Sequence, residues 1–264
     1  MDIVTVAKFP ELVGQAILGL SSAAILSALV SPASAEELPT YTIYRAGTPI
    51  RIDGRLDEPA WVAAPDVGPF QFPWWKEGKK EQTVAKLLYD DENLYVAYLC
   101  EDAHIWAEHT QRDSAVYEDD CVEVFIAPDP DRPRAYFNIE MNVLGAFLDQ
   151  FHPEGPGVPV KEEWNGKGIR IATSRVGTLN DDSDTDQYWI LEAAIPFENY
   201  APVARRVPPR PGDVWHVGLN RCGGQTNLQY SQWSPSNTPK PAFHVPECFG
   251  RMIFSEKASP FWRE

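Results

Sequence analysis

Polar side chains that can form hydrogen bonds or exchange protons stand in two segments of the chain, 121–127 and 136–142. Glu123 lies in the first segment, and Asn138 and Glu140 lie two residues apart in the second. If both segments are β-strands, the period of two places Asn138 and Glu140 on one face of their strand. Carboxylates and a carboxamide that converge on one face of a sheet bind the hydroxyl groups of a ligand, or remain a hydrated surface.

Carboxylate pairs also raise the question of catalysis. Two carboxyl groups about 5 Å apart, or about 6.5 to 9.5 Å apart, can hydrolyse a glycosidic bond, and Glu123, Glu140 and Glu192 all lie in strand-like segments. However, the sequence contains no G-x-S-x-G or H-E-x-x-H motif, and its five histidines are scattered. These observations favour a protein that is not an enzyme, with a glycoside hydrolase as the weaker alternative.

The chain contains nine tryptophans, a large number for 264 residues. Aromatic rings provide either core packing or flat surfaces against which a ligand can stack. Three tryptophans lie within apolar patterns and are predicted to be in the core: Trp61, Trp189 and Trp215. Four others lie in or beside loops, where they anchor the loop or extend a binding surface: Trp74, Trp75, Trp106 and Trp233.

Short apolar and β-branched segments, bounded by Gly, Pro, Asp or Asn, recur along the chain, and helical periodicity is nearly absent. The predicted strands are 41–44, 83–89, 94–101, 121–127, 136–142, 146–151, 169–176, 188–195, 214–221, 228–233 and 251–254. Short helical turns are expected at 57–61 and 196–200. This pattern, with no linker dividing it, predicts an all-β fold: a single antiparallel β-sandwich of two packed sheets with long loops.

The N-terminal region has the layout of a secretory signal peptide. An apolar run at 16–30 is followed by the sequence ASA at 33–35, an A-x-A cleavage motif. We therefore predict a signal peptide at 1–35 and a single mature domain at 36–264, exported to the periplasm or the extracellular space. A buried N-terminal helix is the alternative, because the residues before the apolar run carry more acidic than basic charge.

The formal charge of the chain is −15 at pH 7. Such a surface repels phosphate backbones and anionic lipid headgroups, and the sequence has no basic patch, so nucleic acids and membranes are not expected partners. The cysteines show no C-x-x-C spacing, which argues against a zinc site. Cys100, Cys121, Cys222 and Cys248 could form one or two disulfides in an oxidising compartment, or remain buried thiols. We expect a monomer.

Four segments of the chain, taken in order, carry a family resemblance. They are IDGRLDEPAW at 52–61, KLLYDDENLYVAYLC at 86–100, YEDDCVEVF at 117–125 and FHVPECFG at 243–250. With their surroundings they span 42–254 and resemble the family 9 carbohydrate-binding modules. The resemblance implies a β-sandwich that binds a polysaccharide or an oligosaccharide, often with structural calcium. Such modules are commonly joined to hydrolases of plant polysaccharides, which implies a role in carbohydrate catabolism.

The resemblance also implies a set of ligand-binding residues. Family members hold a sugar between two aromatic side chains, typically tryptophans, and Tyr117 and Phe243 occupy these positions here. Glu123 aligns with a hydrogen-bonding carboxylate, and Asn138 and Glu140 fall on the strand that supplies further polar contacts. Members that bind reducing ends carry arginine where this chain has Asn138, so that specificity is in doubt. The alternative for the two aromatic residues is that they pack loops onto the sandwich.

Acidic loops are the candidates for the implied calcium site, because Ca²⁺ takes about six to eight oxygen ligands. These loops are 181–186, 118–120 and the pair Asp53 and Asp57. Related sandwiches bind haem, for which Met141 or His216 would serve as an axial ligand. A haem-binding or protein-interaction sandwich is therefore the alternative function.

Overall fold

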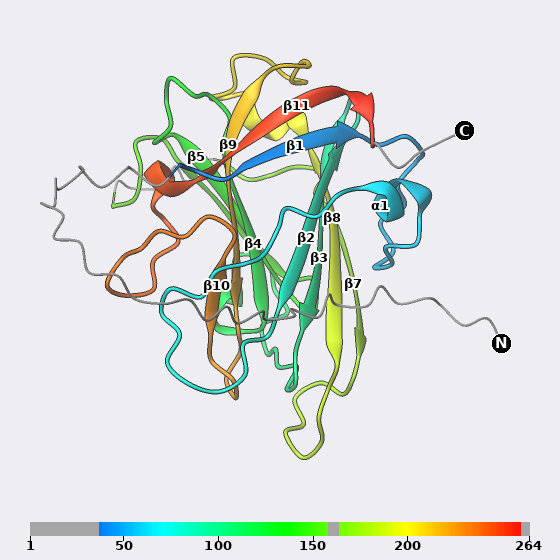
Figure 1. Cartoon of the computed structure of the whole chain (residues 1–264), viewed down its shortest axis with the longest axis vertical. Coiled ribbons are helices and arrows are strands. Elements are labelled where there is room, and N and C mark those ends of the chain that lie inside the picture. Colours follow the sequence, from blue (N-terminus) through cyan, green and yellow to red (C-terminus); the bar gives the residue numbers. More distant parts are fainter. Residues whose placement is uncertain (1–36, 158–163, 260–264) are drawn as a thin grey trace, which may run out of the picture. The chain divides into compact units, whose positions relative to one another are not determined.

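The computed structural model describes residues 37–157 and 164–259 of the chain (Figure 1). The predicted signal peptide at 1–35 lies outside the described residues and stays a prediction. The described residues from Leu38 onward form one compact unit. Within the described ranges, no helix is both long and apolar enough to cross a membrane.

The described residues contain eleven strands, and each predicted strand is found, with small differences at its ends. The strands are β1 (Thr40–Arg45), β2 (Thr83–Tyr89), β3 (Asn93–Glu101), β4 (Cys121–Ala127), β5 (Tyr136–Asn142), β6 (Phe147–His152), β7 (Arg170–Val176), β8 (Tyr188–Pro196), β9 (Val214–Cys222), β10 (Tyr230–Gln232) and β11 (Gly250–Ala258). The short helices are α1 (Pro59–Ala63) and the 3-10 helices η1 (Val116–Glu118), η2 (Phe197–Tyr200) and η3 (Pro246–Cys248). The two expected helical turns correspond to α1 and η2.

The strands pair in one continuous ladder that curls into two layers. Its order is β6-β5-β4-β9-β11-β1-β2-β3-β8-β7, with β10 paired to β9. The half β6-β5-β4-β9 packs on the half β2-β3-β8-β7, and β11 and β1 run side by side between them (Figure 1). The all-β sandwich is confirmed, and the two expected sheets are the two halves of this ladder.

Strand β1 departs from the antiparallel pairing of the other strands. It runs parallel to both neighbours, with Tyr41 opposite Met252 in β11 and Tyr44 opposite Leu88 in β2. A parallel pair cannot be joined by a tight hairpin and needs a crossover of about a dozen residues or more. The segment 46–82, which includes α1, provides the crossover from β1 to β2. Strand β1 thus connects the two halves of the ladder.

Apolar side chains from both layers fill the space between them. In β4, Val122 and Val124 are fully buried in this core, so the residues that alternate with them point to the outer face of the layer. All three predicted core tryptophans are buried: Trp189 and Trp215 lie in this core, and Trp61 lies in a second apolar cluster between α1 and the strands β2, β3 and β8. The core between the layers therefore uses one face of β4, and the other face carries Glu123 between the apolar residues Cys121 and Phe125.

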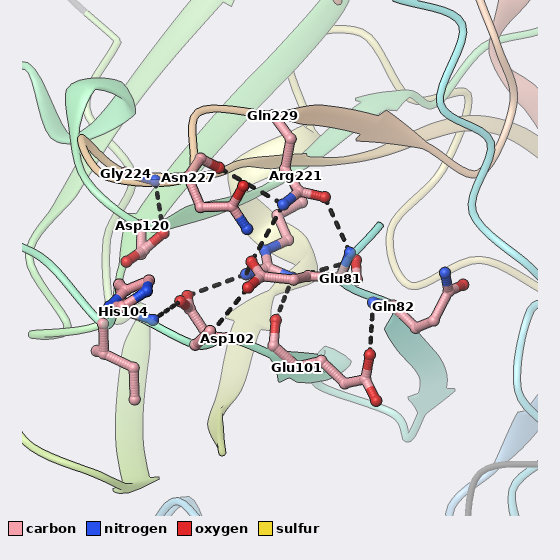
Figure 2. Close-up of polar contacts among 12 residues, drawn as sticks. Glu81, Gln82, Glu101, Asp102, His104, Asp120, Arg221, Gly224, Asn227 and Gln229 are labelled. Atoms are coloured by element: carbon pink, nitrogen blue, oxygen red, sulfur yellow. Dashed lines mark hydrogen bonds and ion pairs between the residues drawn. The ribbon is translucent and has the colours of Figure 1, made fainter. Parts of the chain in front are cut away.

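A buried arginine links the two layers (Figure 2). The Arg221 guanidinium, in β9, donates to the carbonyl oxygen of Glu101 in β3 (2.6 Å) and pairs with the carboxylate of Asp102 (2.9 Å). The carboxylate of Glu81, just before β2, lies 3.5 Å from the same guanidinium. Arg221 directly follows Asn220, whose side chain points to the opposite face of β9. The network therefore ties β9 to β3 at the position next to Asn220.

Candidate functional site

A cleft of about 630 Å³ opens on the outer face of β4 and β5. It is lined by four of the five predicted site residues, Tyr117, Glu123, Glu140 and Phe243. Each comes from a different part of the chain: η1, β4, β5 and the segment before η3 respectively. The fold therefore brings together side chains that are far apart in sequence, while their role in binding stays a prediction.

Glu123 and Glu140 form the floor of the cleft as a directly opposed pair. They are register partners in the β4–β5 ladder. The carbonyl oxygen of Asp120 accepts a hydrogen bond from the N–H of Val143 (3.0 Å), so these two residues are a hydrogen-bonded pair. Hydrogen-bonded and non-hydrogen-bonded pairs alternate along an antiparallel ladder, and Glu123 and Glu140, three positions further on, are therefore a non-hydrogen-bonded pair. The Cα atoms of such a pair are about 4.5 Å apart. The two carboxyl groups therefore project side by side, and both residues are 3% exposed.

Polar neighbours satisfy three of the four oxygens of this carboxyl pair. Asn220 donates its Nδ2 to Oε2 of Glu123 (3.1 Å), and the Cys222 thiol contacts Oε1 of Glu123 (3.6 Å). Asn138 donates its Nδ2 to Oε1 of Glu140 (2.8 Å). Oε2 of Glu140 is buried and has no hydrogen-bond partner among the described residues. One oxygen at the floor of the cleft thus lacks a partner from the described part of the protein.

Asn138, the fifth predicted site residue, lies behind Glu140 and does not line the cleft. It is fully buried. Its carboxamide oxygen is 2.9 Å from Nε2 of His152 in β6, while its Nδ2 holds Glu140. Both ends of the carboxamide are therefore engaged within the protein, and the geometry favours a positioning role for Asn138 over direct contact with a ligand.

Burial sets the charge state of the cleft. It raises the pKa of Glu140 to about 7, and together with the charge of Glu140 it raises the pKa of Glu123 well above its usual value. Burial also lowers the pKa values of His152 and His244 to about 4. At neutral pH both imidazoles are uncharged, and the carboxyl pair retains a proton. Nε2 of His244 lies 4.0 Å from Oε1 of Glu140.

Aromatic side chains form the walls of the cleft. Tyr117 is 48% exposed, whereas Phe243 is 9% exposed. The Phe243 ring packs against Trp74 and Tyr230, with centroid separations of 5.8 and 6.0 Å. The indole N–H of Trp74 donates to the carbonyl oxygen of Thr238 (2.7 Å). Trp74 thus supports one wall from outside the cleft, and Tyr230 extends that wall within it.

Three polar or aromatic residues of the site do not follow from the sequence analysis: Asn220, Tyr230 and His244. Tyr230 lies within a predicted strand, and His244 directly follows Phe243 in the family motif, so local patterns could have identified both. Asn220 meets Glu123 only because β9 pairs with β4. No local sequence signal indicates that pairing.

The other loop tryptophans do not line the cleft. Trp233 is 5% exposed and donates its indole N–H to the carbonyl oxygen of Val67 (2.6 Å), so it anchors a loop. Trp75 is half-buried and packs edge-on against Phe72, with 6.3 Å between the ring centroids. Trp106 is also half-buried. The aromatic surface of the cleft is therefore supplied by the Phe243 wall and by Tyr117.

The candidate calcium loops do not fit a calcium site. Ca²⁺ needs about six to eight oxygen ligands, but carboxylates of these loops accept hydrogen bonds from backbone N–H groups. Asp186 accepts from Ile105 (2.8 Å) and Thr178 (2.7 Å), and Asp119 accepts from Glu108 (3.0 Å) and His109 (3.1 Å). Across the described ranges, no group of three or more acidic, histidine or cysteine side chains is arranged to hold a metal ion. Calcium therefore remains a prediction from the resemblance alone.

The residues named for the alternative functions are separate from the cleft. Met141 is fully buried in the core, and His216 does not line the cleft. Glu192, the third carboxylate considered for catalysis, accepts a hydrogen bond from the indole N–H of Trp61 (2.7 Å) in the other layer. Of the three candidate carboxylates, only Glu123 and Glu140 are paired.

The four cysteines, all within the described part of the chain, are free thiols. Cys100, Cys121 and Cys222 are buried and Cys248 is half-buried. Burial raises the pKa of Cys100 to about 12, so this thiol is protonated at neutral pH. Of the two alternatives for the cysteines, the structure matches buried thiols.

Comparisons with known proteins identify the family. The sequence model of carbohydrate-binding family 9 matches residues 70–254. A putative carbohydrate-binding protein from Bacteroides uniformis ATCC 8492 has a TM-score of 0.69 at 19% identity, over 83% of this chain and 100% of that chain. A family 9 module from Caldicellulosiruptor kristjanssonii, in complex with cellotriose, has a TM-score of 0.57 at 16% identity, over 85% of this chain and 98% of that chain.

A structure of a family 9 module from Caldicellulosiruptor kristjanssonii in complex with glucose has a TM-score of 0.55 at 17% identity, over 85% of this chain and 100% of that chain. At these identities the likeness is one of fold. Among curated proteins, none matches the chain. The family match extends over most of the chain and includes the four cleft residues, and the chain therefore belongs to carbohydrate-binding family 9.

Proposed function

We propose that the cleft is the carbohydrate-binding site of this family 9 domain. Tyr117 and Phe243 stack against the faces of a sugar, while Glu123 and Glu140 bind its hydroxyl groups. A pyranose ring presents apolar C–H faces and a polar edge, so it requires flat apolar walls and a polar floor. The observation that carries the proposal is the convergence of these four side chains on one cleft.

The relatives support a ligand built from glucose-like sugars, since solved structures of a family 9 module hold cellotriose in one case and glucose in the other. The cleft, at about 630 Å³, falls within the usual range of ligand pockets, about 300 to 1,000 Å³. A short oligosaccharide, or a segment of a polysaccharide, is the ligand that we propose. The predicted signal peptide supports export, to a compartment where polysaccharides are degraded.

The proposed domain binds its ligand without hydrolysing it. In glycoside hydrolases the two carboxyl groups flank the scissile bond. Here Glu123 and Glu140 project side by side from neighbouring strands, so both meet the same side of a bound sugar. Incubation of the protein with the best-bound oligosaccharide should release no reducing sugar, and catalytic release that a Glu140→Gln variant lacks would contradict this assignment.

A glycan array probed with the purified chain tests the proposed function. We expect binding to oligosaccharides of glucose-like sugars, and loss of that binding in a folded Tyr117→Ala/Phe243→Ala double variant. A Trp75→Ala variant is the matched control, because Trp75 is a loop aromatic outside the cleft. Binding to no glycan, combined with a haem absorption band in the purified protein, would instead favour the alternative function.

A further inference from the structure

The carboxyl groups that line the cleft are not balanced by positively charged side chains in the described part of its lining. Three carboxyl groups line it, those of Asp113, Glu123 and Glu140, and no lysine or arginine does so among the described residues. Arg112 pairs with Asp149 (2.6 Å) and lies 3.8 Å from the carboxylate of Asp113. It does not line the cleft, so in the part of the chain that the structure describes, Glu123 and Glu140 are the carboxyl groups that lack a cation.

Arg134 pairs with Glu247 and donates to the carbonyl oxygen of Glu154. The histidines closest to the floor do not supply positive charge either, because burial lowers the pKa values of His152 and His244 to about 4. Among the described residues, the carboxyl pair of the floor, Glu123 and Glu140, thus has no cationic partner.

One oxygen atom of this floor lacks a hydrogen-bond donor in the described part of the chain. Oε2 of Glu140 is buried without a hydrogen-bond partner among the described residues, although Glu140 is 3% exposed and lines the cleft. A buried acceptor without a partner is unfavourable, and a charged donor compensates it better than a neutral donor. An ammonium group offers three N–H donors and a positive charge. A carboxylate or sulfate group on a ligand would instead be repelled by the pair.

We propose that this cleft selects glycans by charge: it binds a sugar that carries an amino group more tightly than the same sugar with a hydroxyl group, and it excludes sugars that carry carboxylate or sulfate groups. This inference rests on the proposed function. The amino group donates to Oε2 of Glu140, and the proton retained by the carboxyl pair is released to solvent. The walls and the rest of the floor bind the sugar ring as they do for a neutral ligand.

The test compares three β-1,4-linked tetramers, of glucosamine, glucose and glucuronic acid, by calorimetric titration at pH 6.5. A hydrogen bond to a charged group contributes about 1 to 1.5 kcal/mol more than a neutral one, which is about tenfold in affinity. We therefore expect the glucosamine tetramer to bind about tenfold more tightly than the glucose tetramer, and the glucuronic acid tetramer not to bind measurably. In Glu140→Gln the ratio should fall to about one.

The control variant is Glu198→Gln, which removes the same formal charge from an exposed residue outside the cleft. It should keep the tenfold ratio. If the glucose tetramer binds the parent protein as tightly as the glucosamine tetramer, charge selection is wrong while the proposed function stands. If no neutral or cationic glycan binds, the proposed function itself has failed. The ratio in the parent protein decides the inference even if Glu140→Gln does not fold.

Discussion

The buried carboxyl pair makes the stability of the domain depend on pH, and Glu140→Gln isolates this effect. Glu140 is 3% exposed, and burial raises its pKa from 4.5 to about 7. Between these values the folded state binds more protons than the unfolded state, so the contribution of Glu140 is present below pH 4.5 and is lost as pH rises through 7. Glutamine preserves the shape and hydrogen bonds but does not titrate.

The magnitude follows from the shift in pKa. Each unit corresponds to about 1.4 kcal/mol, so a shift from 4.5 to about 7 amounts to about 3 kcal/mol, most of it lost between pH 5 and pH 8. Glu123 acts in the same direction, because its pKa is also raised. His152 and His244 act in the opposite direction, since their lowered pKa values destabilise the fold as pH falls from 6.5 to about 4.

The assay is urea unfolding of the parent and of Glu140→Gln at pH 5, 6, 7 and 8. The other titrating groups are common to both proteins, so the difference in unfolding free energy reports on Glu140. Between pH 5 and pH 8, we expect the unfolding free energy of the variant to rise by about 2 to 3 kcal/mol relative to that of the parent. Glu198→Gln, on the surface, should show no such shift. A parent–variant difference that stays constant over this range would refute the reasoning.

Two further predictions concern the framework of the domain. Arg221→Met leaves Glu81 and Asp102 buried without their cation (Figure 2), so it should lower the unfolding free energy by about 3 to 5 kcal/mol; a loss below about 1 kcal/mol in urea unfolding would contradict the assigned role. For calcium, the family resemblance predicts a rise in melting temperature on adding Ca²⁺ to chelator-treated protein. Because carboxylates of the candidate loops, such as Asp119 and Asp186, are already hydrogen-bonded, we expect no rise, and a clear rise would show that this interpretation is wrong.

The strands could be predicted because alternation and turn residues are local features. The turn between β2 and β3 is an example: Asp90 accepts hydrogen bonds from the N–H groups of Glu92 and Asn93 (2.8 and 2.7 Å), as an Asx turn does. The parallel pairing of β1 could not be predicted. Its partner β11 comes from the other end of the domain, and nothing in either segment specifies that contact.

The site shows the same division between local and non-local information. Ordered family motifs located Tyr117, Glu123 and Phe243, and the strand that supplies further polar contacts in the family located Glu140; all four line one cleft. The alternation of side chains along the strand placed Asn138 on the same face as Glu140. It does not predict how deeply a side chain is buried, and Asn138 is fully buried and donates to Glu140.

Calorimetric titration of the best-bound oligosaccharide into the parent, Tyr117→Ala and Phe243→Ala is the most direct test of the cleft as the binding site. Losing a stacking face should cost about 1 to 3 kcal/mol, which is about 5- to 150-fold in affinity. Trp75→Ala, outside the cleft, should bind like the parent. If both cleft variants remain folded and bind as tightly as the parent, the sugar is held elsewhere and the assigned site is wrong.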